Sequence, residues 1–387
     1  MWLRALGFYG RVMWFRAFAL PICTVSVLLS ACTTAAVAPT SAPALAVAGA
    51  DRVRDDLDAM IGSGAVGAVA TLTDNDVSTV VTAGVADIAA KSAIGTDRPQ
   101  YVRVGSITKT FTAAIVLQLV AEHRVDLDQP IETYLPGSVA GDGIDGRAIT
   151  VRQVLGHRSG LPQPAESPDI NEYTVARDGR TFTPAQQIAL ALAHPARFAP
   201  GTRFEYTNTN YIVAGMLIEA VTGHRYADEL RDRVLTPLGM SDTYMPATGE
   251  TGLRDPHPNG YATIDGVVTD TTRVEPSALW TSGALVSTGA DLNRFYTALL
   301  TGAVVPPALL PQMLDGTDMG YGDGMSYGLG VGYTQLPCGT QYVGHVGGIA
   351  GFSTIAGATT ARAITIAYTG TPAPVGIRAL LTHALCE

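Results

Sequence analysis

The chain has 387 residues, of which 47% are hydrophobic and 15% are charged, and its formal net charge at pH 7 is −9. This composition is that of a globular protein long enough for one large or two-lobed domain. The acidic balance argues against nucleic acid or acidic polymers as partners, because both attract basic proteins.

The first 31 residues are predicted to be an export signal. Three arginines precede an apolar stretch from Ala17 to Ala31, which is short for a membrane-spanning helix. The residues before Cys32 resemble a bacterial lipobox, in which the cysteine is lipidated and becomes the mature N-terminus. We therefore expect a lipoprotein anchored at the outer face of the cell membrane. The alternative is an ordinary secretory signal cleaved nearby, which would release a secreted protein.

A tether and the start of a folded domain follow the signal. Residues 32 to 50 carry no charge and are rich in Ala, Pro and Thr, as in a flexible linker. We expect the domain to occupy residues 51 to 387. It begins with the amphipathic helical pattern DRVRDDLDAMIGSG, and alternating apolar residues from Ala65 to Leu72 and from Val77 to Val85 predict a β-hairpin.

The C-terminal end mirrors this order, with strands expected near residues 341 to 346, 351 to 358 and 362 to 369 and then a helix at PVGIRALLTHALCE. Between the two ends, helical periodicity dominates from Ser106 to about Leu238. We predict an α/β (α+β) fold, in which an antiparallel β-sheet takes strands from both chain ends and is flanked by the terminal helices. An all-helical lobe is expected to be inserted at about residues 106 to 275.

The segment Gly105-Ser106-Ile107-Thr108-Lys109 opens an apolar helix and places Ser106 and Lys109 on one face. A serine in this position is by default a helix cap, and the S-x-x-K spacing alone is common. However, Lys91 and Lys109 are the only lysines among 25 basic residues. Arginine cannot lose its proton in a protein, whereas a desolvated lysine can act as a general base. We therefore predict that Ser106 is a nucleophile served by Lys109.

Two further motifs contain groups suited to acyl transfer. Tyr206 and Asn208 precede another apolar helix and point the same way on an extended segment, which suits a proton shuttle and a substrate-amide contact. The plain alternative is a helix entry capped by Asn208 or Thr209. The sequence His345-Val346-Gly347-Gly348 is expected at the end of an apolar strand, where glycines admit a substrate backbone. A strand N–H there would complete an oxyanion hole with that of Ser106.

Three motifs of the chain resemble, in their order and spacing, those of the class C β-lactamase and DD-peptidase superfamily of serine hydrolases. They are Ser106-Ile107-Thr108-Lys109, Tyr206-Thr207-Asn208 and His345-Val346-Gly347. The similarity covers nearly all of residues 51 to 387. It is greatest to secreted D-alanyl-D-alanine carboxypeptidases that have a His-x-Gly third motif. The resemblance implies a β-lactamase/transpeptidase-like fold and an acyl-enzyme mechanism without a cofactor.

The resemblance also implies individual roles and one disulfide. The catalytic residues would be Ser106 as nucleophile with Lys109 and Tyr206 as the proton-transfer pair. The substrate-binding residues would be Asn208 for the substrate amide, Trp280 as a wall of the cleft, His345 for electrostatic support, and Gly347 and Gly348. Cys338 and Cys386 stand where these relatives have a bridged pair. We expect them to be bonded in the oxidising compartment.

The sequence departs from these relatives at the positions that hold the substrate's terminal carboxylate. The relatives use two hydroxyls and an arginine, and this chain has Val346, Gly348 and Thr334 instead. Each charge-assisted hydrogen bond lost is worth about 1.5 to 3 kcal/mol, which weakens the expectation of strict recognition of a C-terminal D-alanine. We expect a D-Ala-D-Ala carboxypeptidase-like enzyme acting on peptidoglycan peptide stems. A β-lactamase or carboxylesterase on the same scaffold is the alternative, and a non-catalytic penicillin-binding cell-wall lipoprotein is a remote one.

Other candidate sites are weaker. Gly324-Met325-Ser326-Tyr327-Gly328 matches a nucleophile elbow, but the only acid after Asp323 is Glu387, so the required order of acid and then His is missing. We interpret this segment as a Gly-rich loop entering a strand. The seven histidines show no paired metal spacing, so no metal is expected, and His157 is expected to fix its loop by hydrogen bonding. We expect a monomer.

Overall fold

The structure is a computed structural model that describes residues 47 to 386 except 76, 165 to 169, 321 to 323, 374 and 375. The expected export signal, the expected lipidation site Cys32 and most of the expected tether lie outside the described residues. The domain begins earlier than we expected. Val47 is buried and its backbone N–H donates to Thr79 Oγ1 at 3.0 Å, and the first helix already begins at Ala50. Residues 47 to 50 therefore belong to the domain and not to the tether.

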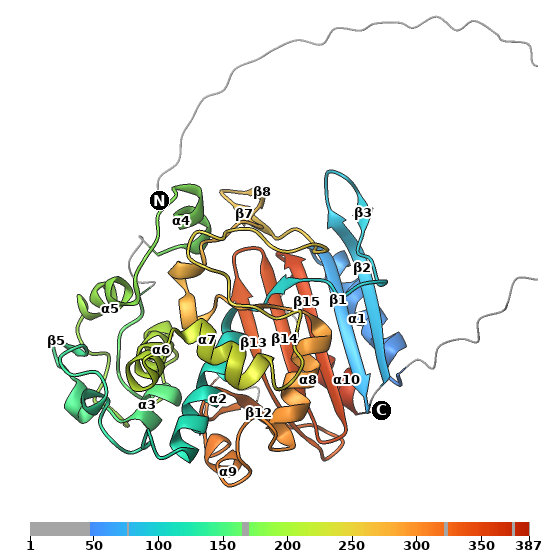
Figure 1. The fold of residues 1–387 in the computed structure, drawn as a ribbon. Helices are drawn as coiled ribbons and strands as arrows, with labels where there is room; N and C mark the ends of the chain where they lie inside the picture. Colours follow the sequence, from blue (N-terminus) through green and yellow to red (C-terminus); the bar gives the residue numbers. More distant parts are fainter. Residues whose placement is uncertain (1–46, 76, 165–169, 321–323, 374–375, 387) are drawn as a thin grey trace, which may run out of the picture. The chain divides into compact units, whose positions relative to one another are not determined.

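An antiparallel sheet of nine strands, in the order β10-β11-β12-β13-β14-β15-β1-β2-β3, forms the centre of the domain (Figure 1). The first strand, β1 (Ala65–Asp74), pairs with the last strand, β15 (Arg362–Gly370), so the sheet joins both chain ends as predicted. The other strands are β2 (Val77–Asp87), β3 (Ser92–Ala93), β10 (Thr317–Asp318), β11 (Ser326–Tyr327), β12 (Gly332–Gln335), β13 (Gln341–Ile349) and β14 (Phe352–Ala358). The predicted mixed fold with an antiparallel sheet is confirmed.

Helices pack on both faces of this sheet. The helices α1 (Ala50–Gly62) and α10 (Ile377–Leu385) share one apolar core with β1 and β15. In α1 the buried residues Val53, Leu57 and Met60 recur at helical spacing between charged residues, which gives the helix one apolar face. The helix α8 (Gly289–Leu300) contacts β1, β14 and β15 and contributes to a second core.

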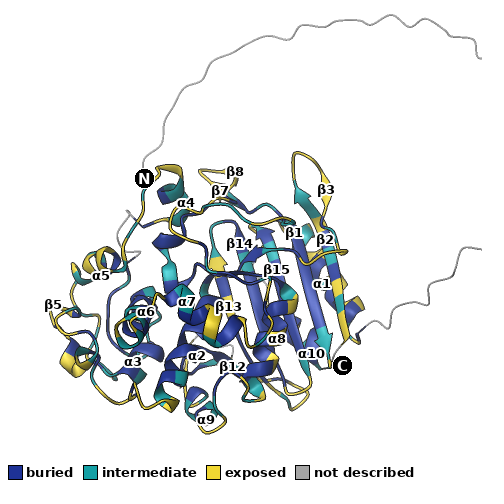
Figure 2. Ribbon diagram, viewed as in Figure 1, coloured by how far each residue is buried: buried dark blue, intermediate teal, exposed yellow. Residues whose placement is uncertain are grey.

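The helix α2 (Thr108–Ala121) lies at the centre of that second core, where its first ten residues are all buried (Figure 2). A helix that is apolar all round is stable only when protein surrounds it. It is contacted by α6 (Asn208–Thr222) and α7 (Tyr226–Leu230), and α6 is also contacted by α3 (Val151–Leu155) and α5 (Pro184–Leu192). The serine motif therefore stands on a rigid element.

The remaining elements are short. The α-helices and strands among them are α4 (Glu172–Arg177) and α9 (Leu310–Met313) and the strand pairs β4 (Val102–Arg103) with β9 (Val286–Ser287), β5 (Ala140–Gly141) with β6 (Ile144–Asp145), and β7 (Tyr261–Ile264) with β8 (Val267–Asp270). The expectation of an all-helical lobe is wrong, because β5–β6 and β7–β8 lie within residues 106 to 275. Each pair is a hairpin closed by a tight Asp-Gly turn, in which Gly143 or Gly266 has a positive φ. None of the helices in the described part of the chain is long and apolar enough to cross a membrane.

Candidate active site

Ser106 and Lys109 lie together at the start of the buried central helix. A 3-10 turn, Gly105–Ile107, leads into α2, and Lys109 lies in the first turn of α2. The Lys109 Nζ atom is 3.0 Å from Ser106 Oγ, 2.8 Å from Asn208 Oδ1 and 2.7 Å from the carbonyl oxygen of Ser282. The turn has no side-chain capping bond. Ser106 is therefore placed for contact with Lys109 and does not cap the helix.

The surroundings of Lys109 favour a neutral amine. Burial lowers the pKa of Lys109 well below its ordinary value. A neutral amine has two N–H donors and one lone pair, and the oxygens of Asn208 and Ser282 can only accept hydrogen bonds. These two acceptors take both N–H groups, so the lone pair faces the Ser106 hydroxyl. This is the arrangement of a nucleophile and its general base.

Tyr206 and Asn208 reach the same lysine from the segment that enters α6. The Lys109 Nζ atom is 4.9 Å from the centre of the Tyr206 ring. Thr207 caps α6, because its side-chain oxygen accepts from the Thr209 N–H at 3.3 Å. The alternative interpretation, in which Asn208 or Thr209 is the cap, is wrong. The side chain of Asn208 contacts Lys109 instead.

Gln163 holds the Tyr206-Thr207-Asn208 segment from the neighbouring loop. Its Oε1 atom accepts from the Asn208 N–H at 2.8 Å and from Thr207 Oγ1 at 3.2 Å. Neither Gln163 nor the Ser282 carbonyl was predicted from the sequence. A loop amide and a backbone carbonyl carry no local signal that could have identified them.

The strand β13 lies so close to the serine turn that two positions require glycine. An alanine Cβ at Gly347 would stand 1.9 Å from the carbonyl oxygen of Val104. A Cβ at Gly105, where φ is +52°, would stand 2.8 Å from the backbone nitrogen of Gly348. The backbones of Gly348 and the serine turn are therefore neighbours, as an oxyanion hole formed by the N–H groups of Ser106 and Gly348 requires.

The third motif lies inside β13 and not at its end, which corrects our expectation. The strand continues to Ile349, and Gly347 and Gly348 pair with Thr354 and Ser353 of β14. The pairing with β14 stabilises this stretch despite the low strand propensity of glycine. At these residues, the edge of β13 that faces away from β14 lies close to the serine turn.

His345 is buried and neutral. Its Nδ1 donates to the carbonyl oxygen of Val346, so its Nε2, 3.0 Å from the Tyr327 hydroxyl, accepts a hydrogen bond from that phenol. Burial lowers the pKa of His345 to about 3. The electrostatic support expected of His345 would therefore come from the dipole of a neutral imidazole and not from a positive charge.

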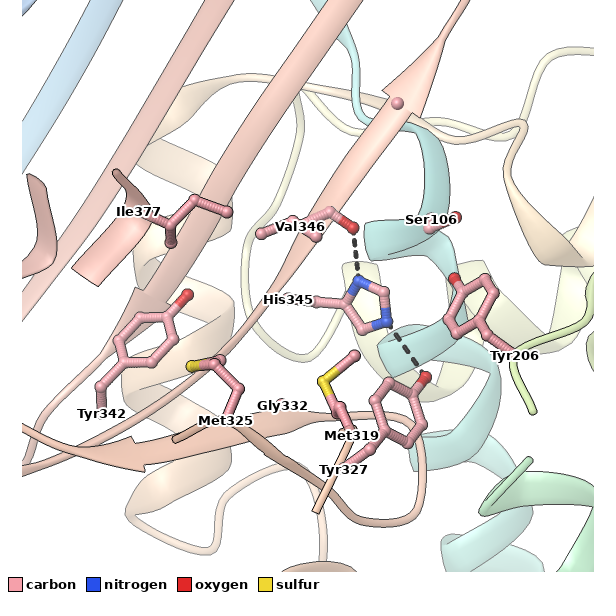
Figure 3. Close-up of a pocket in the computed structure, with 11 residues that line it drawn as sticks. Ser106, Tyr206, Met319, Met325, Tyr327, Gly332, Tyr342, His345, Val346 and Ile377 are labelled. Atoms are coloured by element: carbon pink, nitrogen blue, oxygen red, sulfur yellow. Dashed lines mark hydrogen bonds between the residues drawn. The ribbon is translucent and has the colours of Figure 1, made fainter. Parts of the chain in front are cut away.

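A cavity of about 260 Å³ opens beside Ser106 (Figure 3). Ser106, Tyr206 and His345 lie at one end of it, and Tyr342 and Ile377 lie at the other. The full lining is Ser106, Tyr206, Met319, Met325, Tyr327, Gly332, Tyr342, His345, Val346, Gly348 and Ile377. Among the residues that the structure describes, no Asp, Glu, Lys or Arg lines this cavity.

The three positions that depart from the expected carboxylate ligands lie at or near this cavity and offer no positive charge. Val346 and Gly348 line the cavity, and the Val346 side chain is among the exposed apolar groups. Thr334 is buried, and its hydroxyl donates to the carbonyl oxygen of Gly324 at 2.9 Å.

The nucleophile-elbow segment contributes to the site through its other residues. Ser326 lies in the short strand β11 opposite Tyr333 and is not part of the cavity lining. Its neighbours Met325 and Tyr327 do line the cavity. The expected loop entering a strand is present, but no role was predicted for these two residues from the sequence.

Trp280 and the cysteine pair border the site. Trp280 begins the short turn Trp280–Ser282, whose last residue contacts Lys109, but Trp280 itself is not part of the cavity lining. Cys338 and Cys386 are bonded, as the resemblance implied. The bond ties the end of α10 to the turn between β12 and β13, and Ile377 of α10 lines the cavity.

This fold, with a serine and a buried lysine on its central helix, defines a serine hydrolase of the β-lactamase and penicillin-binding superfamily. A family model described as Beta-lactamase matches residues 51–382. The chain belongs to this family.

Relatives with several activities share the fold. A D-stereospecific amidohydrolase from a Streptomyces species is 35% identical, with a TM-score of 0.79 over 86% of this chain and 98% of its own. The D-amino acid amidase from Ochrobactrum anthropi SV3, complexed with D-phenylalanine, is 27% identical, with a TM-score of 0.74 over 86% of this chain and 96% of its own. Penicillin-binding protein 4 of Amycolatopsis lactamdurans is 29% identical over 52% of this chain. The match covers only 51% of that protein, so the chain spans about half the length of this curated relative.

Proposed function

We propose that this protein hydrolyses amide bonds in small peptides or amides of D-amino acids, through an ester formed on Ser106. We also propose that the group leaving the scissile carbonyl is uncharged. The cavity beside Ser106 carries this proposal, since its described lining is apolar or neutral where a carboxypeptidase would hold a carboxylate.

The proposed reaction has two halves. In the first, Ser106 Oγ attacks the carbonyl carbon, its proton passes to Lys109 Nζ, and the N–H groups of Ser106 and Gly348 bind the oxyanion. Tyr206 transfers a proton to the leaving nitrogen, the C–N bond breaks and the amine departs. In the second half, water attacks the Ser106 ester and gives its proton to the Tyr206 phenolate. The acid is released, and Lys109 returns its proton to the serine oxygen.

The position of Tyr206 indicates which part of the substrate enters the cavity. The leaving nitrogen must lie within reach of the group that protonates it. Tyr206 and Ser106 both line the cavity, and they lie at the same end of it (Figure 3). A leaving group protonated by Tyr206 therefore extends toward Met325, Tyr342 and Ile377 at the other end.

This placement disfavours the D-Ala-D-Ala carboxypeptidase activity that the sequence favoured. A carboxylate moved from water into an apolar cavity without a partner loses hydration worth several kcal/mol. Val346 and Gly348 offer it no side-chain hydroxyl, and the hydroxyl of Thr334 is bonded to Gly324. An amide, a further peptide unit without a terminal charge, or an ester would avoid this cost.

The activities in the names of two relatives support an uncharged leaving group. The D-stereospecific amidohydrolase and the D-amino acid amidase both cover 86% of this chain. Their names describe cleavage of amides with D stereochemistry. This is the support for assigning a D-amino acid to the acyl half of the substrate.

The test compares two substrates that differ only in the charge of the leaving group, N-acetyl-D-alanyl-D-alanine and its carboxamide. We expect the carboxamide to have a kcat/KM at least about tenfold higher, which corresponds to roughly 1.4 kcal/mol. The Ser106→Ala variant, assayed alongside, should cleave neither. Preference for the free acid would overturn the proposal and restore the carboxypeptidase assignment.

Benzylpenicillin distinguishes the β-lactamase alternative. It carries a carboxylate, so the proposal predicts slow acylation of Ser106 in a time-resolved intact-mass experiment. Rapid release of penicilloate would instead identify a β-lactamase. Cleavage of esters together with no cleavage of any amide would identify a carboxylesterase.

We further propose that the protein is exported and anchored through lipid on Cys32. The support is the arginine-containing apolar leader and the lipobox-like residues before Cys32. The mass of the mature N-terminal peptide tests this proposal. A diacylglyceryl adduct on Cys32, absent from Cys32→Ser, is expected, and an unmodified N-terminus would identify a secreted form.

A further inference from the structure

The imidazole of His157 is buried directly against the Tyr206 phenol. The ring centres are 4.1 Å apart with an angle of 34° between the planes. The His157 side chain has no exposed surface. It therefore forms a wall that limits where the Tyr206 ring can lie.

Two hydrogen bonds fix the orientation of this imidazole. The Nδ1 atom is 3.2 Å from the Thr207 backbone nitrogen and 3.1 Å from Asn210 Nδ2. Both partners are donors, so Nδ1 is an acceptor and the ring proton is on Nε2. The Asn210 amide is oriented in turn by Ser159, whose hydroxyl donates to Asn210 Oδ1 at 2.6 Å.

The backbone of His157 holds the same segment. Its carbonyl oxygen accepts from the Glu205 N–H at 2.9 Å. Its φ of 54° lies in the left-handed region, which a residue other than glycine adopts only where its surroundings require it. His157 thus contacts three successive residues, Glu205 through its carbonyl, Tyr206 through its ring and Thr207 through Nδ1.

We propose that His157 is a positioning residue that holds the Tyr206 hydroxyl in reach of the leaving group. The inference rests on the proposed function only in giving Tyr206 the role of proton donor to that group. His157 itself transfers no proton, because its Nδ1 lone pair is directed at the Thr207 and Asn210 N–H groups. Burial also lowers the pKa of His157 well below its ordinary value, so the ring stays neutral.

Two variants separate the two contacts. His157→Phe keeps an aromatic ring against Tyr206 but loses the acceptor for the Thr207 N–H. His157→Asn keeps an acceptor atom in the place of Nδ1 but removes most of the ring. Both variants displace the Tyr206 hydroxyl if the two contacts together fix its position. Misplacement of a catalytic group by about 1 Å can reduce a rate by about 100-fold.

The readout is the dependence of kcat/KM on the leaving group, measured with the methyl ester and the nitrophenyl ester of one N-acyl-D-amino acid. Methoxide needs a proton in order to leave, whereas nitrophenolate does not. We expect both variants to lose at least about tenfold on the methyl ester and less than about threefold on the nitrophenyl ester. Tyr206→Phe should show the same pattern.

A change in kcat/KM that does not depend on the leaving group would overturn the inference. Equal losses on both esters would mean that His157 supports the whole site and not Tyr206, and unchanged kcat/KM values would mean that it has no role. If the His157 variants do not fold, Ser159→Ala removes the bond that orients Asn210, together with the bond from the Leu161 N–H to the same oxygen, and it should show the same selective loss to a smaller degree. If the protein cleaved both esters but no amide, only the proposed function would be refuted. The inference about His157 would stand, because the two esters test it without any amide substrate.

Discussion

A single methyl group at Gly347 should separate the two halves of the proposed oxyanion hole. The Cβ of an alanine there would lie 1.9 Å from the carbonyl oxygen of Val104 and 3.3 Å from the Ser106 backbone nitrogen. Both obstacles are backbone atoms, which cannot turn away as the end of a flexible side chain can. Gly347→Ala must therefore move β13 and the serine turn apart.

The size of the effect follows from this geometry. Restoring an ordinary contact requires a separation of roughly 1.5 Å. Misplacement by about 1 Å can cost about 100-fold in rate, and loss of one oxyanion donor costs about 100- to 1,000-fold. We expect kcat/KM to fall at least about 100-fold. The free energy of unfolding should fall by about 1 to 3 kcal/mol, as for other overpacked sites.

The assay combines nitrophenyl ester hydrolysis with denaturant unfolding of wild type and Gly347→Ala. Gly348→Ala is the matched control for stability, because a Cβ there meets nothing within 4 Å and the backbone N–H remains. Its free energy of unfolding should stay within about 0.5 kcal/mol of wild type. A Gly347→Ala protein with wild-type kcat/KM would refute the close approach of β13 to the serine turn.

Three further variants and one pH profile test Lys109, His345 and the disulfide. Lys109→Arg should reduce acylation of Ser106, measured by intact mass, at least about 1,000-fold, because arginine cannot take up the serine proton; a smaller loss would mean that Lys109 is not the base. In wild type, kcat/KM should fall as the pH is lowered, since the pKa of Lys109 is depressed and protonation removes the base. The His345→Gln variant should show the same fall in kcat/KM at the same pH, because His345 has a pKa of about 3 and stays neutral throughout. A fall at a different pH would assign the pH dependence to the imidazole. Replacing Cys338 and Cys386 by serine should lower the free energy of unfolding by about 2 to 4 kcal/mol in a urea titration, since the bond closes a loop with a sequence separation of 48; an unchanged midpoint and slope would show that the bond does not restrain the unfolded chain.

Local patterns in the sequence predicted much of the fold and the centre of the site. Alternating apolar residues identified β1 and β2, and Lys109 stood out because the chain otherwise uses arginine almost throughout. Ser106 and Lys109 are one helical turn apart, so their contact follows from helix geometry alone. The motif around Tyr206 lies 97 residues beyond Lys109, and only the family resemblance brought these residues together.

Contacts that depend on the assembled fold could not be predicted in this way. The Ser282 carbonyl reaches Lys109 across 173 residues of sequence, and any residue at that position would present a carbonyl. Tyr327 meets His345 only because β11, β12 and β13 are neighbours in the sheet. The position of His345 inside a strand was missed because glycines usually indicate a strand end, whereas here they allow the close approach of β13 to the serine turn.

The most direct test of Ser106 as the nucleophile is time-resolved intact mass with peptide mapping after mixing with a nitrophenyl ester of an N-acyl-D-amino acid. Ser326→Ala, in the nucleophile-elbow sequence, is the matched control for Ser106→Ala. We expect an acyl adduct on the peptide that contains Ser106 in wild type and in Ser326→Ala, and no adduct in Ser106→Ala. An adduct that persists in Ser106→Ala, or that disappears in Ser326→Ala, would contradict the assignment of the nucleophile.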